Sequence, residues 1–261
     1  MLLDSLADNT VVWDRKCMNV EIHDNQWVLS FENGTQAIAD FIIVANGGMS
    51  AIREFVTDTQ VEDTGTLIIQ GDIPDPEKEC PEFYKLCNGK RLMTAYQGTL
   101  IVINPNNNGA LSYGIILKNS DDYTFASKDD HSIREFLLEK FSDWDHHYRD
   151  LFQSTLSFWC LPTRKFPVNK PWKHNRPLPI TLIGDAAHMM PPFAGQGVNI
   201  GLKDALILSN NLTNGIYTCV QDAIDNYEQQ MFIYAKEAQI SSSLNEIEMR
   251  NPDFSFQQLI L

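Results

Sequence analysis

One stretch, residues 179–199, constrains the fold of this 261-residue chain more than any other. It opens with a short apolar run at residues 179–183, which is typical of a buried strand. That pattern stops at Gly184-Asp185, and a Pro-Pro pair and then Gly195-Gln196-Gly197 follow. Apolar residues next recur at helical spacing from Leu202. The stretch therefore predicts a buried strand, a loop of small residues and a helix.

The residue types in this loop suit a particular ligand chemistry. A carboxylate such as Asp185 at a strand's C-terminal end can bind a polyhydroxyl ligand in the crevice of an open α/β sheet. Glycines lack Cβ, so their backbone N–H groups can come close to a flat ring. At a helix N-terminus those groups also favour negative charge, such as that on the pyrimidine edge of a reduced flavin. A Gly-Asp pair alone would favour an ordinary turn, whereas the whole ordered set favours a flavin loop.

The ordered set is Gly-Asp-Ala-Ala-His-x-x-Pro-Pro-x-x-Gly-Gln-Gly-x-Asn, from Gly184 to Asn199. It resembles the second FAD-contacting motif of the class A flavoprotein monooxygenases of the aromatic-hydroxylase type. Among these it is most similar to the tetracycline-inactivating enzymes, the tetracycline destructases, and the similarity extends to the tail at residues 245–249 and 254–258. The resemblance implies FAD and NADPH as cofactors. The residues it assigns to the cofactor site are Asp185 at the ribityl chain, Pro192, Gly195, Gln196, Gly197, Val198 and Asn199 around the ring, and Asn46 and Gly47.

Asn46 and Gly47 belong to a second motif, Ala45-Asn46-Gly47-Gly48-Met49-Ser50-Ala51-Ile52-Arg53. The hydroxylases that it resembles carry Ala-Asp-Gly-x-x-Ser-x-x-Arg here, serving the FAD and nicotinamide phosphates. Asn46 stands in place of that Asp, which keeps hydrogen bonding and turn tolerance but removes a charge. The alternative is a glycine turn into a helix capped by Ser50.

Strand-like segments dominate the first two thirds of the chain. Thr10–Trp13, Trp27–Phe31 and Phe41–Ala45 are β-branched and aromatic, and the third is apolar throughout, as in a parallel strand buried on both faces. Further segments occur at Thr66–Gln70, Leu100–Ile103 and Leu111–Ile116, with a hairpin signal at residues 104–109 that predicts an antiparallel sheet. Helical periodicity is found at Ser132–Phe141, Leu202–Leu212 and Gln221–Arg250.

These patterns predict a mixed α/β (α+β) fold. We expect an incomplete FAD/NAD(P)-binding Rossmann-like domain formed by residues 1–64 and 166–220. Residues 65–165 would form an antiparallel-sheet substrate domain. Residues 221–261 would form a long C-terminal helix that bridges the two domains, as the resemblance implies.

The 261 residues contain no Gly-x-Gly-x-x-Gly. In dinucleotide-binding folds this fingerprint holds the pyrophosphate, and its strand lies in the middle of the sheet. Because Leu2–Leu6 already matches the family's helix before the strand at Thr10, we expect the whole first βαβ unit to be absent. Weak FAD binding and an unpaired apolar edge at Phe41–Ala45 would follow. We interpret the chain as a truncated monooxygenase, inactive as given; the alternatives are a non-catalytic remnant and an acidic binding module without flavin.

The resemblance also implies the reaction, in which NADPH reduces FAD and a flavin C4a-hydroperoxide transfers oxygen to a polycyclic substrate such as tetracycline, conferring antibiotic resistance. No general base is expected. The residues assigned to the substrate are Gln70, Arg91, Gly114, Phe193, Met249 and Phe256. Ser112 and Val102 depart from the pattern, because relatives tend to carry a His and a larger aromatic residue there.

Composition excludes some functions. A net charge of −14 repels phosphate backbones, so a nucleic-acid partner is not expected. We expect a cytoplasmic monomer with no membrane partner and no metal site, in which the five scattered cysteines are free thiols. The one basic segment, residues 164–177, is either a solvated return loop or an NADPH contact.

Overall fold

The computed structural model of the chain describes residues 3–119 and 129–259. These residues form two compact units. Unit 1 comprises residues 1–61, 166–190 and 195–239, and unit 2 comprises residues 62–165, 191–194 and 240–261. The long helix α7 (Val220–Met249) supplies residues to both units, with the division after residue 239.

Unit 1 begins with a three-stranded antiparallel sheet in the order β1-β2-β3. Its strands are β1 (Cys17–His23), β2 (Gln26–Phe31) and β3 (Gln36–Ala39). Asp24 and Asn25 form the β1–β2 turn at φ 48° and 60°, a conformation that short polar side chains tolerate. Trp27 on β2 is fully buried, and its indole N–H donates to the Pro179 carbonyl at 3.1 Å. The predicted strand at Trp27–Phe31 is therefore confirmed.

The strand predicted at Thr10–Trp13 is wrong, because the structure has turns and bends there. Val12 and Trp13 are exposed, so strand-forming side chains alone did not supply a pairing partner. The strand that pairs with β2 is the more polar β1, which the pattern did not reveal. The helix expected at Leu2–Leu6 is reduced, among the described residues, to the single 3-10 turn η1 (Leu3–Ser5).

A short parallel pair forms the centre of unit 1. Here β4 (Ile42–Val44) pairs in parallel with β10 (Ile180–Leu182), which confirms the parallel strand. The predicted burial of both faces holds for β10 but is wrong for β4, where Ile43 is exposed. All three residues of β10 are fully buried, and they share a core with α7 residues such as Tyr227 and Met231. The remaining elements of unit 1 are η2 (Ile52–Phe55), α5 (Asp185–His188) and α6 (Gly197–Thr213).

The second edge of β4 has no partner strand among the described residues, since its sheet contains only β10 and β4. Ile43 on this strand is 39% exposed, and the neighbouring Phe41 is 36% exposed. The unpaired apolar edge expected at Phe41–Ala45 is therefore present in the structure.

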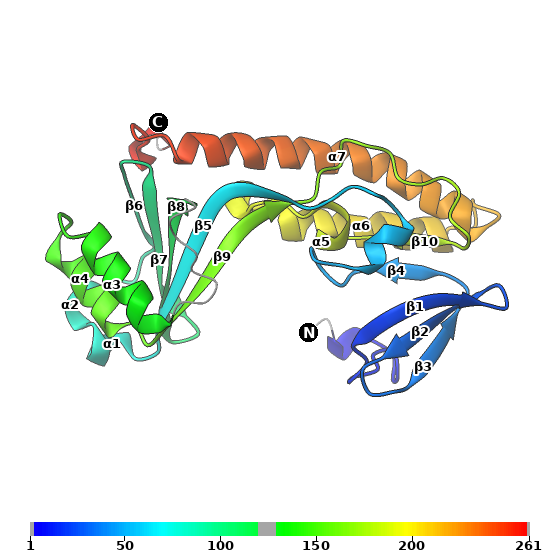
Figure 1. Cartoon of the computed structure of the whole chain (residues 1–261), viewed down its shortest axis with the longest axis horizontal. Coiled ribbons are helices and arrows are strands. Elements are labelled where there is room, and N and C mark those ends of the chain that lie inside the picture. Colours follow the sequence, from blue (N-terminus) through cyan, green and yellow to red (C-terminus); the bar gives the residue numbers. More distant parts are fainter. Residues whose placement is uncertain (1–2, 120–128, 260–261) are drawn as a thin grey trace. The chain divides into compact units, whose positions relative to one another are not determined.

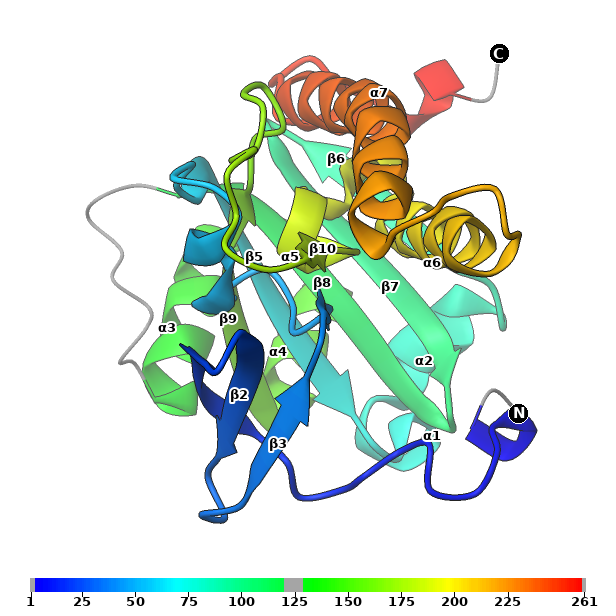
Figure 2. The ribbon, with the colours of Figure 1, turned by 90° about the vertical axis from the view of Figure 1, so that its right-hand side faces the viewer.

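Unit 2 is built on a five-stranded antiparallel sheet in the order β6-β7-β8-β5-β9. Its strands are β5 (Glu62–Ile73), β6 (Leu92–Tyr96), β7 (Thr99–Asn107), β8 (Ala110–Lys118) and β9 (Ser157–Lys165). Figure 2 shows β7, β8 and β5 side by side in this sheet. The antiparallel sheet and three of its strands are confirmed, whereas β6 and β9 were not predicted.

Four helices cover one face of this sheet (Figure 1). They are α1 (Pro76–Glu79), α2 (Pro81–Cys87), α3 (Asp130–Lys140) and α4 (His146–Ser154). The predicted helix at Ser132–Phe141 is confirmed as α3, and its residues Ile133 and Leu137 are buried against the sheet. The predicted hairpin is confirmed too, with Asn108 and Gly109 at φ 53° and 89° between β7 and β8.

The last part of α7 docks onto unit 2 through a buried carboxylate. Glu246 Oε1 accepts hydrogen bonds from Thr64 Oγ1 at 2.6 Å and Thr66 Oγ1 at 2.5 Å, both on β5. The 3-10 turns η4 (Pro192–Ala194) and η5 (Phe256–Leu259) complete this unit. The mixed α/β fold with antiparallel sheets and a long C-terminal helix is thus as predicted, while the division into functional domains stays a prediction.

In residues 3–119 and 129–259, no helix is both long and apolar enough to span a membrane. All five cysteines are free.

The exposed edge of β4 is expected to promote aggregation of the chain. We expect Ile43→Glu to slow aggregation of the purified chain severalfold, because a charge on an unpaired apolar edge opposes strand-to-strand association. Light scattering over time at fixed concentration measures this. The matched control is Leu156→Glu, which adds the same charge at an exposed leucine outside any strand. Equal slowing in both variants would mean that net charge, and not the edge, is responsible.

Candidate functional site: three loops at one edge of unit 1

Three loops meet beside the parallel pair of unit 1. They follow β4 (residues 46–50), follow β10 (residues 184–188) and lead into α6 (residues 195–201). Carboxyl ends of parallel strands lie at the same sheet edge, so β4 and β10 bring the first two loops together. The third is close as well, since a Cβ on Gly201 would lie 3.4 Å from the Gly184 Cα.

Arg53, from η2, ties the first loop to the second. Its Nη2 donates to the Gly48 carbonyl at 2.8 Å and its Nε donates to the Ala186 carbonyl at 2.9 Å. Its guanidinium also lies over the Phe166 ring, 4.0 Å from the ring centroid. The two predicted cofactor motifs are therefore physically connected through one side chain.

The turn after β10 requires glycine at its first position. Gly184 has φ 59° and ψ −142°, a region that is essentially restricted to glycine. Asp185 follows and is exposed, whereas the next residues, Ala186, Ala187 and His188, are fully buried. The turn therefore presents the Asp185 carboxylate outward from a tightly packed base.

The glycine-rich loop before α6 is open. Within the described parts of the chain, nothing lies within 4 Å of a Cβ built on Gly195 or Gly197. The side chain of Gln196, the N-cap residue of α6, makes no capping hydrogen bond, and Val198 in the first turn is 77% exposed. The first backbone N–H groups of an α-helix have no intrahelical acceptor. These amides are therefore available to a ligand.

The structure brings together most but not all of the predicted cofactor residues. Asn46 and Gly47 lie in the loop that Arg53 ties to the Asp185 turn, and residues 195–199 lie in the loop that contacts Gly184 through Gly201. Pro192 belongs to unit 2 and is linked to this cluster through the chain.

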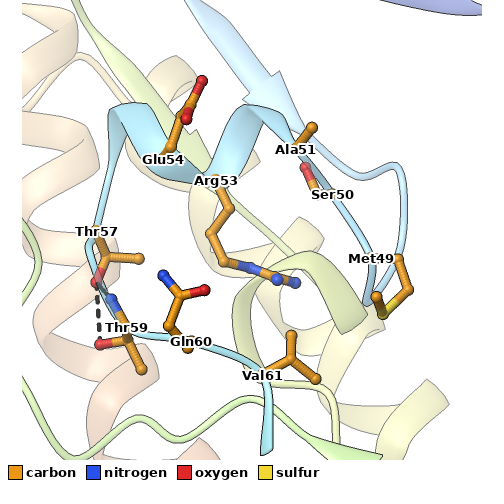
Figure 3. Close-up of a pocket in the computed structure, with 9 residues that line it drawn as sticks. All are labelled: Met49, Ser50, Ala51, Arg53, Glu54, Thr57, Thr59, Gln60 and Val61. Atoms are coloured by element: carbon orange, nitrogen blue, oxygen red, sulfur yellow. Dashed lines mark hydrogen bonds between the residues drawn. The ribbon is translucent and has the colours of Figure 1, made fainter.

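A cavity of about 320 Å³ adjoins the loop after β4 (Figure 3). It is lined by Met49, Ser50, Ala51, Arg53, Glu54, Thr57, Thr59, Gln60 and Val61. In Figure 3 the Arg53 side chain extends toward Met49 and Val61. Arg53 is only 6% exposed, and burial lowers the pKa of its guanidinium from the ordinary value.

Ser50 in this cavity corrects one sequence-based alternative. The turn η2 begins at Ile52 with Ala51 as its N-cap residue, so Ser50 does not cap a helix. The Ser50 hydroxyl is buried, and among the residues that the structure describes it has no hydrogen-bond partner. A buried hydroxyl beside a buried cation is a suitable place for an anion.

The basic segment at residues 164–177 forms ion pairs within the chain. Lys165 pairs with Glu62 at 3.2 Å, and Lys173 pairs with Asp58 at 2.7 Å. Arg176 forms a buried pair with Glu228 at 2.5 Å. These contacts favour the return-loop interpretation over an NADPH contact.

In unit 2 some of the predicted substrate residues share one sheet face. Gln70 on β5 pairs with Gly114 on β8, which in turn pairs with Val102 on β7. Partners across a sheet point to the same face, so these three positions form one row. Gly114 leaves room in that row, since a Cβ there would meet only Ile68 Cγ2, at 3.7 Å.

The remaining substrate candidates lie elsewhere in unit 2. Arg91 is exposed just before β6, and Met249 ends α7. Phe256 makes an edge-to-face contact with Phe254, with ring centroids 5.1 Å apart. Phe193 is held through its carbonyl, which accepts from Asn245 Nδ2 at 3.1 Å. No described contact joins these four residues to Gln70.

One buried group of the site was missed by the sequence analysis. Asp204 on α6 is fully buried and hydrogen-bonds to the Gly184 N–H, at 2.7 Å. A signal existed, because Asp204 interrupts the buried stripe formed by Ile200 and Leu208 at spacings of four residues. A carboxylate in an apolar stripe indicates a buried partner.

The family is shown by a sequence profile described as an FAD binding domain, which matches residues 27–239. The chain belongs to this FAD-binding domain family. Hispidin-3-hydroxylase of Neonothopanus nambi is 30% identical to this FAD-binding domain over 226 residues, which cover 77% of the chain and 51% of the relative. The chain spans about half the length of these curated relatives.

Solved structures share the fold. HpxO of Klebsiella pneumoniae, complexed with FAD and uric acid, superposes with a TM-score of 0.73 at 18% identity, covering 94% of this chain and 60% of that one. The tetracycline destructase Tet(55) superposes with a TM-score of 0.72 at 22% identity, covering 95% and 64%. The resemblance to class A FAD-dependent hydroxylases is confirmed at this level.

Two glycine substitutions test the geometry of this FAD-binding domain. We expect Gly184→Ala to lower the free energy of unfolding by about 1–3 kcal/mol, because its backbone conformation strains any residue with a Cβ. Gly197→Ala should change it by less than about 1 kcal/mol, in the stabilising direction, because its Cβ would enter open space. Urea denaturation of both variants measures the difference. Equal destabilisation would contradict the described loop.

Proposed function

We propose that this FAD-binding domain works in an FAD- and NADPH-dependent monooxygenase that hydroxylates a polycyclic substrate such as tetracycline. The observation that carries the proposal is the open glycine loop at the N-terminus of α6, beside the exposed Asp185 turn. An open loop of uncapped amides fits a flat, electron-rich ring, and an outward carboxylate fits a hydroxylated chain.

A bound flavin would supply the redox and oxygen-transfer chemistry. The residues of this chain would hold and orient the flavin. The amides at the start of α6, at Gly197, Val198 and Asn199, would donate to the pyrimidine edge and stabilise negative charge there. Asp185 would accept hydrogen bonds from ribityl hydroxyls.

The cavity beside η2 supports a role for NADPH or for the FAD phosphates. It places the buried guanidinium of Arg53 and the unpartnered hydroxyl of Ser50 together, next to the loop at Asn46 and Gly47. Both groups can donate to a phosphate oxygen. Asn46 adds hydrogen-bonding capacity without the negative charge that would oppose a phosphate.

The row of Gln70, Gly114 and Val102 supports the substrate proposal. An amide beside a glycine leaves space for a planar molecule, and the other candidates, Arg91, Phe193, Met249 and Phe256, supply a cation and apolar surface. Tet(55) is named for tetracycline, and the HpxO structure contains uric acid, so planar ring systems occur among the structural neighbours. The small Val102 and Ser112 favour a substrate that differs in shape from tetracycline at those positions.

A second candidate is a non-catalytic protein without bound flavin. The unpaired edge of β4 favours it, together with the lack of a Gly-x-Gly-x-x-Gly in the 261 residues. A protein of these residues alone has the proposed ring loops but no fingerprint loop for the pyrophosphate.

Flavin content separates the two candidates for the chain as given. We expect a preparation of these 261 residues to contain far less than one flavin per chain, because the pyrophosphate contacts of the fingerprint are missing. Absorbance at flavin wavelengths against protein concentration measures the ratio. A yellow preparation with one flavin per chain would contradict this expectation.

A chimera tests the ring loops directly. We expect that fusing a strand–Gly-x-Gly-x-x-Gly–helix segment ahead of residue 1 restores flavin binding. In that chimera Gly197→Val should reduce flavin occupancy at least tenfold, because a branched side chain would keep the ring away from the amides of α6. The matched control is Ala205→Val, which places the same branched side chain at an exposed position further along α6. A colourless chimera would count against the assignment of the ring loops.

A further inference from the structure

The buried carboxylate of Asp204 makes more contacts than packing alone requires. Its Oδ2 accepts from the Gly184 N–H at 2.7 Å and lies 2.6 Å from His188 Nε2. Its Oδ1 accepts from the Tyr234 hydroxyl at 2.5 Å. Asp204 and His188 are both fully buried.

These contacts restrain both ends of one short turn, residues Gly184–His188. Gly184 is the first residue of the turn and His188 is the last residue of α5, so one carboxylate contacts the two residues that flank the segment containing Asp185. An ionised or polar group buried without partners is strongly unfavourable, so the Gly184 N–H, the Tyr234 hydroxyl and the His188 ring nitrogen are the partners that allow a carboxylate at this position. Moving the turn would remove two of these partners, Gly184 and His188, at once.

The second grip on the turn comes from a cation. Arg53 donates to the Ala186 carbonyl at 2.9 Å and, more weakly, to the Asp185 carbonyl at 3.4 Å. Asp204 thus holds an N–H at one end of the turn while Arg53 holds carbonyls in its middle. Opposite charges therefore restrain complementary backbone groups of the same five residues.

We propose that Asp204 and Arg53 are positioning residues that hold the Gly184–His188 turn in its ligand-presenting shape before any cofactor binds. The role of that shape in binding a flavin rests on the proposed function; the clamp itself does not. Neither residue is assigned to the proposed ring, and within the Gly184–His188 turn the residue assigned to the ligand is Asp185.

Tyr234 supplies the control for this clamp. The Tyr234 hydroxyl, on α7, donates to Oδ1 of Asp204, whereas the turn residues Gly184 and His188 contact Oδ2. Tyr234 therefore supports the carboxylate without a described hydrogen bond to the turn. Burial, with a further contribution from Asp204, raises the pKa of Tyr234 well above its ordinary value, so its hydroxyl stays a donor. Tyr234→Phe should therefore weaken the protein without freeing the turn.

Amide hydrogen exchange on the flavin-free 261-residue chain tests the clamp. The Ile183 N–H is the internal reference, because it bonds to the Val44 carbonyl at 3.0 Å and owes nothing to Asp204. In Asp204→Ala we expect protection of the Gly184 amide to fall at least tenfold more than that of Ile183. In Tyr234→Phe the two should fall by the same factor, as global destabilisation requires.

Two milder variants keep the test decisive if Asp204→Ala does not fold. Asp204→Asn keeps one acceptor oxygen and should cause a smaller selective loss at Gly184. Arg53→Met should selectively expose the Ala187 amide, which bonds to the Gly184 carbonyl at 2.9 Å within the turn. In the wild-type chain, nitrogen chemical shifts of His188 should show the proton on Nε2, where it can donate to Asp204.

Equal loss at Gly184 and Ile183 in the Asp204 variants, or at Ala187 and Ile183 in Arg53→Met, would overturn the clamp. Because no flavin is present, that failure would leave the proposed function intact. Conversely, a colourless chimera would contradict the proposed flavin site but would not affect the hydrogen-exchange evidence for the clamp.

Discussion

The parallel pairing of β4 with β10 is the constraint on which the site depends. Only three residues of each strand pair, yet this pairing places two loops at one sheet edge. The β10 strand can sustain it because it is completely buried against α7. If β4 slipped by one residue along β10, the exposed side chain of Ile43 would exchange places with the buried side chains of Ile42 and Val44, and the two loops would shift relative to each other.

Hydrogen bonds from buried polar side chains then fix the conformation of the loops that this pairing brings together. Arg53 and Asp204 are more than nine-tenths buried. Arg53 donates to backbone carbonyls of two loops, whereas Asp204 contacts the backbone N–H of Gly184 and the side chains of His188 and Tyr234. A buried charge has few alternative partners, so each restricts its loop to arrangements that keep the bonds. Unit 2 contains a similar arrangement, in which Glu246 of α7 is buried and its carboxylate accepts from threonine hydroxyls on β5.

Much of the fold could be predicted from the sequence, for reasons visible in particular elements. The apolar runs at β4 and β10, the hairpin at Asn108-Gly109 and the periodicity of α3 and α7 are local signals, and the structure bears them out. The wrong predictions concern segments whose local composition does not reveal whether a partner strand is present. Thr10–Trp13 has strand-forming residues but no partner strand, whereas the polar β1 is a strand because β2 pairs with it. The strands β6 and β9 were missed because their side chains alternate between core and surface without a long apolar run.

The candidate site divides in the same way. The order of residues from Gly184 to Asn199 was sufficient to predict a strand, a glycine loop and a helix, and to identify the family, because those features are encoded in neighbouring positions. The carboxylate of Asp204, the orphan hydroxyl of Ser50 and the position of Arg53 between two loops depend on contacts between residues up to 133 positions apart. Only the tertiary structure could decide these, since burial and partner choice are properties of the packed chain and not of any segment within it.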